Sequence, residues 1–125
     1  MTEAGLAASA DAGGPLRVDR MRRRADFLRA AKGHASRMPG FVLQGRSRGD
    51  AGPARIGFTC SKKVGTAVAR NRAKRRLREI ARLELPVAGR AGWDYVLIGL
   101  RDRTAARDFA RMRSELAAAL ERVHR

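Results

Sequence analysis

Positive charge is concentrated in one stretch of the chain, residues 62–82. The stretch contains nine Lys or Arg residues and one acidic residue, Glu79. Such a density of cations suits phosphate binding, because each positive side chain can replace a counterion on a nucleic acid backbone. Solubilising helix faces usually mix charges of opposite sign, whereas Lys74, Arg78 and Arg82 carry like charges four residues apart. We therefore interpret the stretch as a surface for binding a polyanion.

Residue types that could catalyse a reaction are scattered instead. The acidic residues form no cluster, and His34 and His124 lie in a predicted loop and near the C-terminal end, where we expect surface positions. Protein nucleases of this size usually group carboxylates around metal ions or pair a His with another base. Cys60 is the only cysteine and falls in a predicted strand, which indicates an apolar filler. The sequence therefore predicts neither a catalytic residue nor a metal site in the protein.

The whole chain is strongly basic. Its 28 Lys and Arg residues outnumber its 12 Asp and Glu residues, so the formal net charge is +16 over 125 residues. Nucleic acid is the partner class that best balances such a charge. An anionic membrane fits less well, because the positions opposite the charges are mostly Ala rather than bulky apolar residues. With no secretion leader and no apolar span visible, we expect a cytoplasmic protein without a membrane partner or a small-molecule substrate.

The basic stretch needs a regular element to hold it. Small and apolar residues recur there at helical spacing, which predicts a helix over residues 62–82. One side of that helix carries Ala69, Ala73, Leu77 and Ile80. The other side carries Asn71, Lys74, Arg75, Arg78 and Arg82, flanked by Arg70, Arg72 and Arg76. We expect the first side to pack on a sheet and the charged side to face solvent.

The remaining sequence predicts the rest of one domain. Residues 1–19 are small and without periodicity, which predicts a disordered tail before a single RNA-binding domain over residues 20–125. Pro86 and the stretch from Gly89 to Gly92 should end the basic helix. Other predicted elements are a helix over 22–32, strands over 41–44, 55–61 and 93–100, and a last helix capped by Thr104 with an apolar stripe of Phe109, Met112, Leu116, Leu120 and Val123. This order indicates an α+β fold, a two-layer sandwich of a mixed sheet of about four strands with about three helices.

The basic stretch also carries a resemblance to a known family. The run SKKVGTAVARNRAKRRLRE (residues 61–79), preceded by RIGFTC, resembles the bacterial ribonuclease P protein subunit, whose basic helix has an Arg-Asn-Arg core. Arg70, Asn71 and Arg72 form that core here. Weaker similarity follows in the same order in ADFLRAAKGH (25–34), GFVLQ (40–44) and GWDYVLIGLRD (92–102).

The resemblance implies a non-catalytic protein subunit of an endoribonuclease. Ribonuclease P hydrolyses precursor tRNA to remove its 5′ leader, and the chemistry belongs to a catalytic RNA and to Mg²⁺ ions bound mainly by that RNA. The implied partners are this catalytic RNA and the 5′ leader of precursor tRNA. The family fold also contains a rare left-handed strand-helix-strand crossover around the basic helix, against the usual right-handed rule.

The resemblance further implies which residues bind RNA. A cleft for the single-stranded leader would be lined or bordered by Phe27, Thr59, Lys62 and Lys63. The RNA-binding set would be Lys62, Lys63, Arg70, Asn71, Arg72, Lys74, Arg75, Arg78 and Arg82. Phe27 has two interpretations, a platform on which a base stacks and the core anchor of the first helix. Ala31 and Gln44 stand at two further cleft positions where the family often has an aromatic residue, so leader contacts here should be weaker or more electrostatic.

Two other function classes fit parts of the pattern. A ribosome-associated or other RNA-binding protein without a nuclease role would carry the same charge. A DNA-binding protein would also be basic, but the sequence has no zinc-ligand spacing and no helix-turn-helix pattern. The ribonuclease P interpretation accounts for the motif as well as for the charge.

Overall fold

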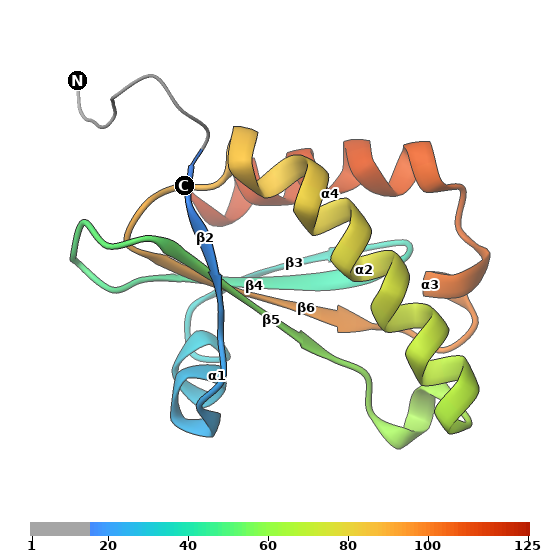
Figure 1. The fold of residues 1–125 in the computed structure, drawn as a ribbon. Coiled ribbons are helices and arrows are strands. Elements are labelled where there is room, and N and C mark those ends of the chain that lie inside the picture. Colours follow the sequence, from blue (N-terminus) through green and yellow to red (C-terminus); the bar gives the residue numbers. More distant parts are fainter. Residues whose placement is uncertain (1–15) are drawn as a thin grey trace.

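The computed structural model describes residues 16–125, which form a mixed sheet packed between helices (Figure 1). The elements, in chain order, are β2 (Val18–Arg20), α1 (Arg24–Ala30), β3 (His34–Met38), β4 (Phe41–Ser47), β5 (Ala54–Thr59), the 3-10 turn η2 (Lys62–Val64), α2 (Ala67–Ala88), β6 (Trp93–Gly99), α3 (Arg103–Ala106) and α4 (Phe109–Val123).

The sheet has the strand order β2-β5-β6-β4-β3. β6 is central because its run WDYVLIG is almost continuously apolar and can be covered on both faces. It pairs parallel with β5 and antiparallel with β4, which in turn pairs antiparallel with β3. Since α2 joins the parallel neighbours β5 and β6, the chain contains the expected strand-helix-strand crossover. Its left-handed sense stays a prediction of the resemblance.

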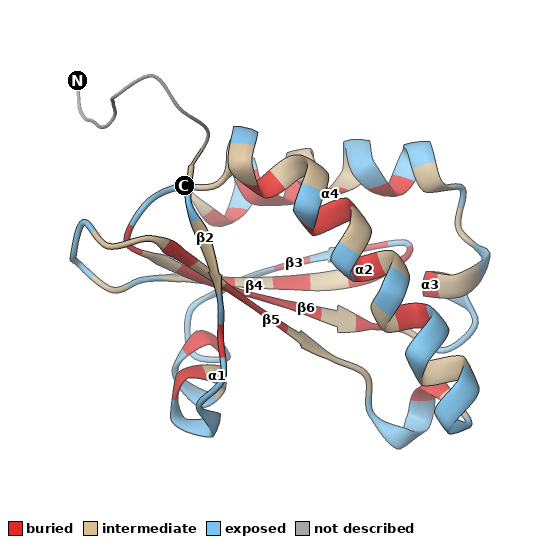
Figure 2. Cartoon of the chain, in the orientation of Figure 1, coloured by how far each residue is buried: buried red, intermediate tan, exposed pale blue. Residues whose placement is uncertain are grey.

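Helices cover both faces of the sheet. α2 and α4 lie above it in the view of Figure 1 and α1 lies below. The larger core is on the α2 and α4 side, where Phe41, Leu77 and Tyr95 are fully buried. A smaller cluster of Met21, Ala30 and Val96 lies between α1 and the sheet. Figure 2 shows the buried positions along the strands and on the sheet-facing sides of α2 and α4.

The α+β class with a mixed sheet is confirmed, with differences in detail. The sheet has five strands rather than four, because the short, polar segments of β2 and β3 pair at its edges without an apolar pattern that would predict them. Residues 16–125 contain four α-helices rather than three, and α1 adds a layer on the second face. Val18 and Asp19, assigned to the tail, belong to β2, which pairs parallel with β5. Leu16 and Arg17 precede β2, and the remaining residues of the predicted tail, 1–15, lie outside the described residues.

The basic stretch was predicted to be one helix, but it consists of the turn η2 followed by α2. The turn η2 holds Lys62 and Lys63, and Gly65 then adopts φ 134°, a value that side chains rarely tolerate. α2 starts after Thr66, whose hydroxyl accepts a hydrogen bond from the N–H of Ala69 at 3.2 Å. α2 also continues past Pro86 to Ala88 and ends at Gly89, the first residue of the predicted Gly89–Gly92 stop.

The last helix also starts later than predicted. Asp108 caps α4 by accepting a hydrogen bond from the N–H of Arg111, and Thr104 lies in the preceding short helix α3. The Thr104 hydroxyl is buried, donates to the Gly40 carbonyl at 2.7 Å and accepts from the Leu100 N–H at 2.8 Å. It therefore ties β6 to the turn before β4 instead of capping a helix. The predicted stripe of α4 is confirmed, with all members buried except the half-buried Phe109.

Candidate nucleic-acid interface

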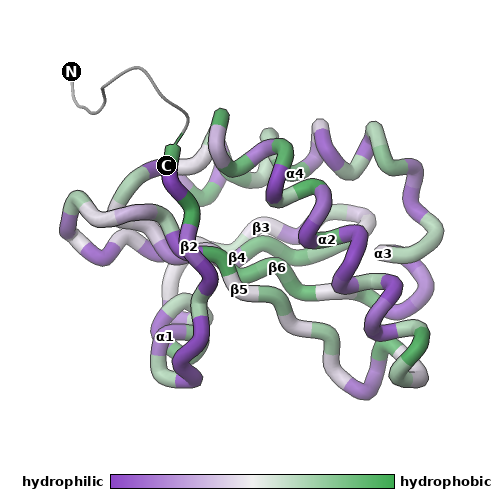
Figure 3. The backbone as a smooth tube through the Cα atoms, viewed as in Figure 1, coloured by the Kyte–Doolittle hydropathy of each residue, from purple (hydrophilic) through white to green (hydrophobic). Residues whose placement is uncertain are grey.

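α2 divides into a buried side and a charged side, as predicted. Leu77 and Ile80 are 0% exposed and belong to the main core, and Ala73 is 2% exposed. The helix packs on β5, β6 and α4 through this side. Because small and apolar residues take up the whole contact, the long basic residues are left on the outside. Figure 3 shows hydrophilic and hydrophobic positions alternating along α2 at the spacing of its turns.

The outward side presents most of the predicted RNA-binding set. Five members are exposed and two are half-buried: Asn71, Arg72, Arg75, Arg78 and Arg82 in the first group, Arg70 and Lys74 in the second. Arg82 is paired within the helix, because its guanidinium donates to the carboxylate of Glu79 one turn earlier. This exposed pair adds little stability and is open to exchange with a phosphate.

Arg76, which the helical wheel places at the flank of the charged side, turns inward. Its Nε donates to the Thr104 carbonyl at 3.0 Å and its Nη2 donates to the Arg107 carbonyl. The guanidinium also lies over the Phe109 ring, 5.7 Å from the centroid. Arg76 therefore fastens α2 to α3 and to the start of α4, and it is a structural residue rather than a surface cation. Sequence spacing alone does not distinguish it from its exposed neighbours.

The residues assigned to the leader cleft lie on the α1 side of the sheet. The half-buried Phe27 ring rests on Gly57 of β5, where a Cβ atom would come within 2.5 Å of the ring. Thr59 is two residues further along β5 and faces the same way. Lys62 and Lys63 are exposed on η2, beyond the end of β5 rather than beside Phe27. In Figure 1, α1 and η2 both lie below the sheet, at opposite ends of β5.

Phe27 anchors α1 in the structure. It packs with the small cluster of Met21, Ala30 and Val96, and the missing side chain of Gly57 makes room for its ring. The core-anchor interpretation is therefore supported by the packing, and a base could contact only the part of the ring left uncovered. Of the positions without the family's aromatic residue, Ala31 is exposed just after α1. Gln44 is half-buried on β4, opposite Val96.

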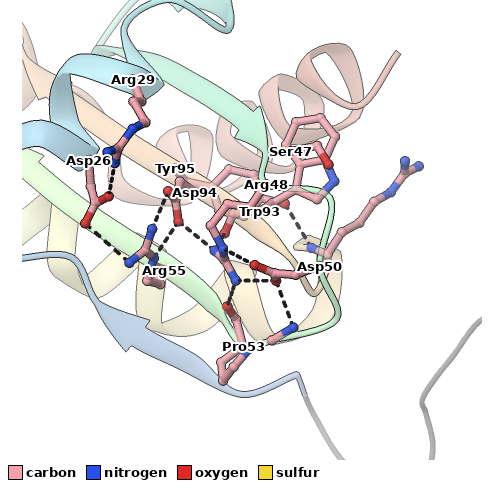
Figure 4. Close-up of polar contacts among 12 residues, drawn as sticks. Asp26, Arg29, Ser47, Arg48, Asp50, Pro53, Arg55, Trp93, Asp94 and Tyr95 are labelled. Atoms are coloured by element: carbon pink, nitrogen blue, oxygen red, sulfur yellow. Dashed lines mark hydrogen bonds and ion pairs between the residues drawn. The ribbon is translucent and has the colours of Figure 1, made fainter.

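A chain of ion pairs holds α1 on the sheet (Figure 4). Asp94 of β6 is 2% exposed. Its Oδ1 accepts hydrogen bonds from Arg48 at 2.6 Å and from Arg55 at 2.7 Å, and its Oδ2 accepts a second one from Arg55 at 2.7 Å. Arg55 reaches across to Asp26 of α1 at 3.3 Å, and Asp26 also pairs with Arg29 at 2.7 Å. The hydrogen bonds to Asp94 raise the pKa of the Arg55 guanidinium. This network sets where α1 lies relative to β5 and β6, and thus positions Phe27.

Sequence reasoning missed this network. The available signal was Asp94 itself, the one acid inside the apolar run of β6, since a buried carboxylate needs a partner. The partners are 39 and 46 residues away in sequence, so their identity depends on the strand pairing.

The family model described as Ribonuclease P matches residues 16–124. The chain belongs to the ribonuclease P protein family. The match takes in the RNR core, the charged side of α2 and the residues around Phe27, and it confirms the resemblance carried by residues 61–79.

Relatives of the ribonuclease P protein family are similar over most of their length. The ribonuclease P protein component of Ruegeria pomeroyi is 56% identical over 107 residues, covering 83% of this chain and 85% of that protein. The component of Caulobacter vibrioides is 48% identical over 112 residues, covering 89% and 74% respectively. Among solved structures, the RNase P protein from Thermotoga maritima has a TM-score of 0.69 and 33% identity over 84% of this chain and 97% of that one. The Staphylococcus aureus RNase P protein has a TM-score of 0.66 and 27% identity over 82% and 92%.

His124 was predicted to lie on the surface, but it is partly enclosed by the fold. It is half-buried, and its Nε2 lies 2.6 Å from the Tyr95 hydroxyl, which accepts a hydrogen bond from the Arg90 N–H at 2.9 Å. The Tyr95 hydroxyl and the His124 imidazole share one hydrogen bond, whose donor depends on the tautomer of the ring. Burial, with a contribution from the charge of Arg90, lowers the pKa of His124 to about 4. The residue fastens the end of α4 to β6. His34 is exposed, as predicted.

Cys60 and the acidic residues do not combine into a metal site within residues 16–125. Cys60 is half-buried against the main core, and burial raises the pKa of its thiol despite the nearby Lys74 and Arg70. Within residues 16–125, no three His, Cys, Asp or Glu side chains are grouped so that they could hold a metal ion. None of the helices in that range has the length and hydrophobicity that a membrane crossing needs.

Proposed function

We propose that this chain is the protein subunit of a bacterial ribonuclease P that binds the catalytic RNA and the 5′ leader of precursor tRNA. Its role is to promote Mg²⁺-dependent endonucleolytic removal of the leader, an activity that belongs in the cytoplasm. The relatives named ribonuclease P protein component support the subunit role, and the geometry of α2 supports the RNA-binding role.

The observation that carries the proposal is the division of α2. Leu77 and Ile80 on its apolar side are fully buried in the core, whereas Arg72, Arg75 and Arg78 are exposed on the other side. A row of like charges on a rigid helix destabilises the free protein slightly and binds phosphates without further ordering. This side of α2 is the proposed contact with the catalytic RNA.

The reaction itself is assigned to the RNA. Mg²⁺ ions polarise the scissile phosphodiester and activate water in this kind of hydrolysis. The described residues of the protein offer no cluster of side chains that fits such an ion. We therefore give the protein no chemical step: its cations offset the repulsion between the catalytic RNA and the substrate, and its α1 side positions the leader.

The leader site is proposed on the α1 side, bordered by Phe27, Thr59, Lys62 and Lys63. The separation of Lys62 and Lys63 from Phe27 along β5 suits an extended single strand rather than a compact ligand. Because most of the Phe27 ring is committed to packing, phosphate contacts with the lysines should contribute more than base stacking.

Reconstitution tests the proposal. Purified protein, the ribonuclease P RNA of the same organism, and both together are incubated with precursor tRNA at low Mg²⁺ concentration. Faster 5′ cleavage by the mixture than by the RNA alone, and no cleavage by the protein alone, is the expected result. Cleavage by the protein alone would overturn the assignment of chemistry to the RNA. Tight binding to ribosomal RNA with no effect on cleavage would favour the ribosome-associated alternative.

A second measurement in the same system isolates the leader site. The Lys62→Ala/Lys63→Ala double variant should weaken binding of precursor tRNA to the assembled complex while leaving mature tRNA, which has no leader, unaffected. Equal losses for the two RNAs would place these lysines on the catalytic RNA instead.

A further inference from the structure

A groove runs between β2 and α2 on the face opposite α1. It encloses about 430 Å³, within the range of roughly 300–1,000 Å³ that small-molecule sites occupy. Its lining is apolar except for two arginines: Leu16, Val18, Ile56 and Phe58 from the sheet, and Arg78, Ala81, Arg82, Leu85 and Pro86 from the helix. Since Phe27 lies on the other side of the sheet, this groove is separate from the leader site described above.

The groove is built by backbone pairing and does not result from loose packing. β2 is held beside β5 by parallel pairing, with Arg20 opposite Ile56. The N–H of Leu16 donates to the carbonyl of Pro86 at 3.2 Å, which joins the start of the sheet edge to the end of α2. These two connections hold the strand and the helix apart, and within residues 16–125 the apolar floor between them stays open.

Cations surround the apolar floor. Arg78 and Arg82 line the groove from α2, and both are exposed. On the other side, the Arg20 guanidinium of β2 lies 5.9 Å from the centroid of the Phe58 ring. Phe58 is half-buried, so its ring is shared between the core and the groove. The groove therefore combines an aromatic ring, a guanidinium plane and two further positive charges.

We propose that this groove receives one unpaired base of the partner RNA, which stacks against Phe58 and Arg20 while its flanking phosphates pair with Arg78 and Arg82. A nucleotide joins a flat base with apolar faces to an anionic phosphate, and that pairing matches the floor and the rim. RNA-binding proteins commonly hold unpaired bases on aromatic rings and arginine planes. The inference rests on the proposed function.

Charge and position favour RNA over other occupants of the groove. A lipid chain or an apolar peptide would fill the floor but would supply no anion to Arg20 and Arg78. An acidic peptide would satisfy the arginines. However, Arg78 belongs to both the groove and the charged side of α2, so one RNA can cover both surfaces in a continuous contact.

The test replaces the aromatic ring and keeps the charge. Phe58→Leu retains an apolar side chain in the groove but removes the stacking surface. The matched control is Phe109→Leu on α4, since Phe109 is also half-buried against the main core and also lies under an arginine, Arg76, at 5.7 Å. Both variants are assembled with the ribonuclease P RNA of the same organism. Affinity, its salt dependence and chemical protection of unpaired bases are measured.

The expected result is a 5- to 20-fold loss of RNA affinity for Phe58→Leu beyond that for Phe109→Leu, because a stacked base contributes about that factor or more. The salt dependence should be unchanged, since no charge is lost. At least one unpaired base protected by the parent protein should become reactive with Phe58→Leu and stay protected with Phe109→Leu. Equal affinity and equal protection for the two variants, with a parent that binds and stimulates cleavage, would overturn the groove inference alone. Failure of the parent itself would instead overturn the proposed function.

A second pair of variants covers the case in which Phe58→Leu does not fold. Arg20→Lys keeps the charge beside the groove and removes the guanidinium plane, and Arg17→Lys makes the same change just before β2 at a residue outside the groove. We expect the same base to lose protection with Arg20→Lys only. Identical protection in both variants would overturn the inference.

Discussion

Asp94 is the residue on which the position of α1 depends most. It is almost completely buried between two arginines, one from the loop after β4 and one from β5, and the second of these continues to α1. A buried carboxylate in such a network is stabilised only as long as its partners are present. The network therefore connects four segments of the chain: β6, the loop after β4, β5 and α1.

We expect Asp94→Asn to destabilise the protein by about 3–5 kcal/mol, because it removes the buried charge that Arg48 and Arg55 share and leaves them only their pairs with Asp50 and Asp26. Asp50→Asn is the matched control. Asp50 pairs with the same Arg48 but is exposed, so its loss should cost less than about 1 kcal/mol. Denaturant unfolding measures both variants. Similar free energies of unfolding for the two would show that burial of the network contributes nothing.

His124 gives the fold a dependence on pH. Its pKa is about 4 in the folded protein and ordinarily 6.5, so the unfolded chain binds the proton more readily. Stability from this residue is complete above about pH 6.5 and is lost as pH falls toward 4. Between pH 7 and pH 5 we expect a loss of about 1–2 kcal/mol, less than the full shift implies, because the ring is partly exposed to solvent.

The variant His124→Gln separates this contribution from the titration of acidic residues. It should lose less stability than the parent between pH 7 and pH 5, and the exposed control His34→Gln should behave like the parent. Parallel pH profiles for all three proteins would contradict the assignment. The charged and titratable groups around the ring are Arg90 and Tyr95, and neither changes its charge in this pH range.

At the scale of elements, α2 performs two tasks with separate sets of residues. The inward set of Leu77 and Ile80 holds the helix on the sheet, and Arg76 fastens it to α3. The outward set of Arg75 and Arg78 is free of the core. Each task can therefore be removed without the other.

We expect the Arg75→Ala/Arg78→Ala double variant to keep or slightly raise its melting temperature, because repulsion along the helix falls. Its affinity for the ribonuclease P RNA should fall, with the salt slope reduced by about one for each lost phosphate contact. Leu77→Ala should instead cost about 2–5 kcal/mol of stability. Arg76→Ala, the matched control for charge, should cost about 1–3 kcal/mol and leave the salt slope of the folded protein unchanged. A double variant that unfolds yet binds RNA normally when folded would reverse the assignment of the two sides.

Periodicity predicted the elements with large apolar faces and failed at their ends. β6, the buried side of α2 and the stripe of α4 were predicted because burial requires apolar residues at regular spacing. The break at Gly65 and the continuation past Pro86 depend on local backbone geometry, which a count of apolar positions does not contain. The edge strand β2 is specified by pairing with β5, far along the chain, and β3 by a hairpin with the adjacent β4, although neither edge strand has an apolar pattern of its own.

The sequence predicted those features of the candidate site that depend on the position of a single residue in its own element. The exposed cations of α2 follow from spacing alone, and so does the position of Phe27 on the first helix. What spacing does not contain is which residues meet across the fold. Arg76 was placed with the surface cations, and neither the network of Asp94 nor the groove lined by Phe58 was predicted, because each is assembled from segments brought together only by the sheet.

At the scale of the whole molecule, charge dominates the expected binding behaviour. A formal net charge of +16 on 125 residues attracts any polyanion, and the attraction weakens as salt replaces the protein at the phosphates. We expect the logarithm of RNA affinity to fall linearly with the logarithm of salt concentration, with a slope of about −0.7 to −0.9 per phosphate contact. Titrations at several KCl concentrations measure the slope. An affinity that stays flat from low to moderate salt would contradict an electrostatic interface.

The strand order has a consequence for synthesis on the ribosome. β6 is the last strand to be made, yet it lies between the pair β2 and β5 and the pair β3 and β4, which share no other strand. Two-stranded pieces are marginally stable at best, and the cluster under α1 also needs Val96 of β6. The nascent chain should therefore stay open to proteases until Trp93–Gly99 has left the exit tunnel, and then close almost at once. Protease resistance in chains stalled before β6 emerges would show that one of the strand pairs folds alone.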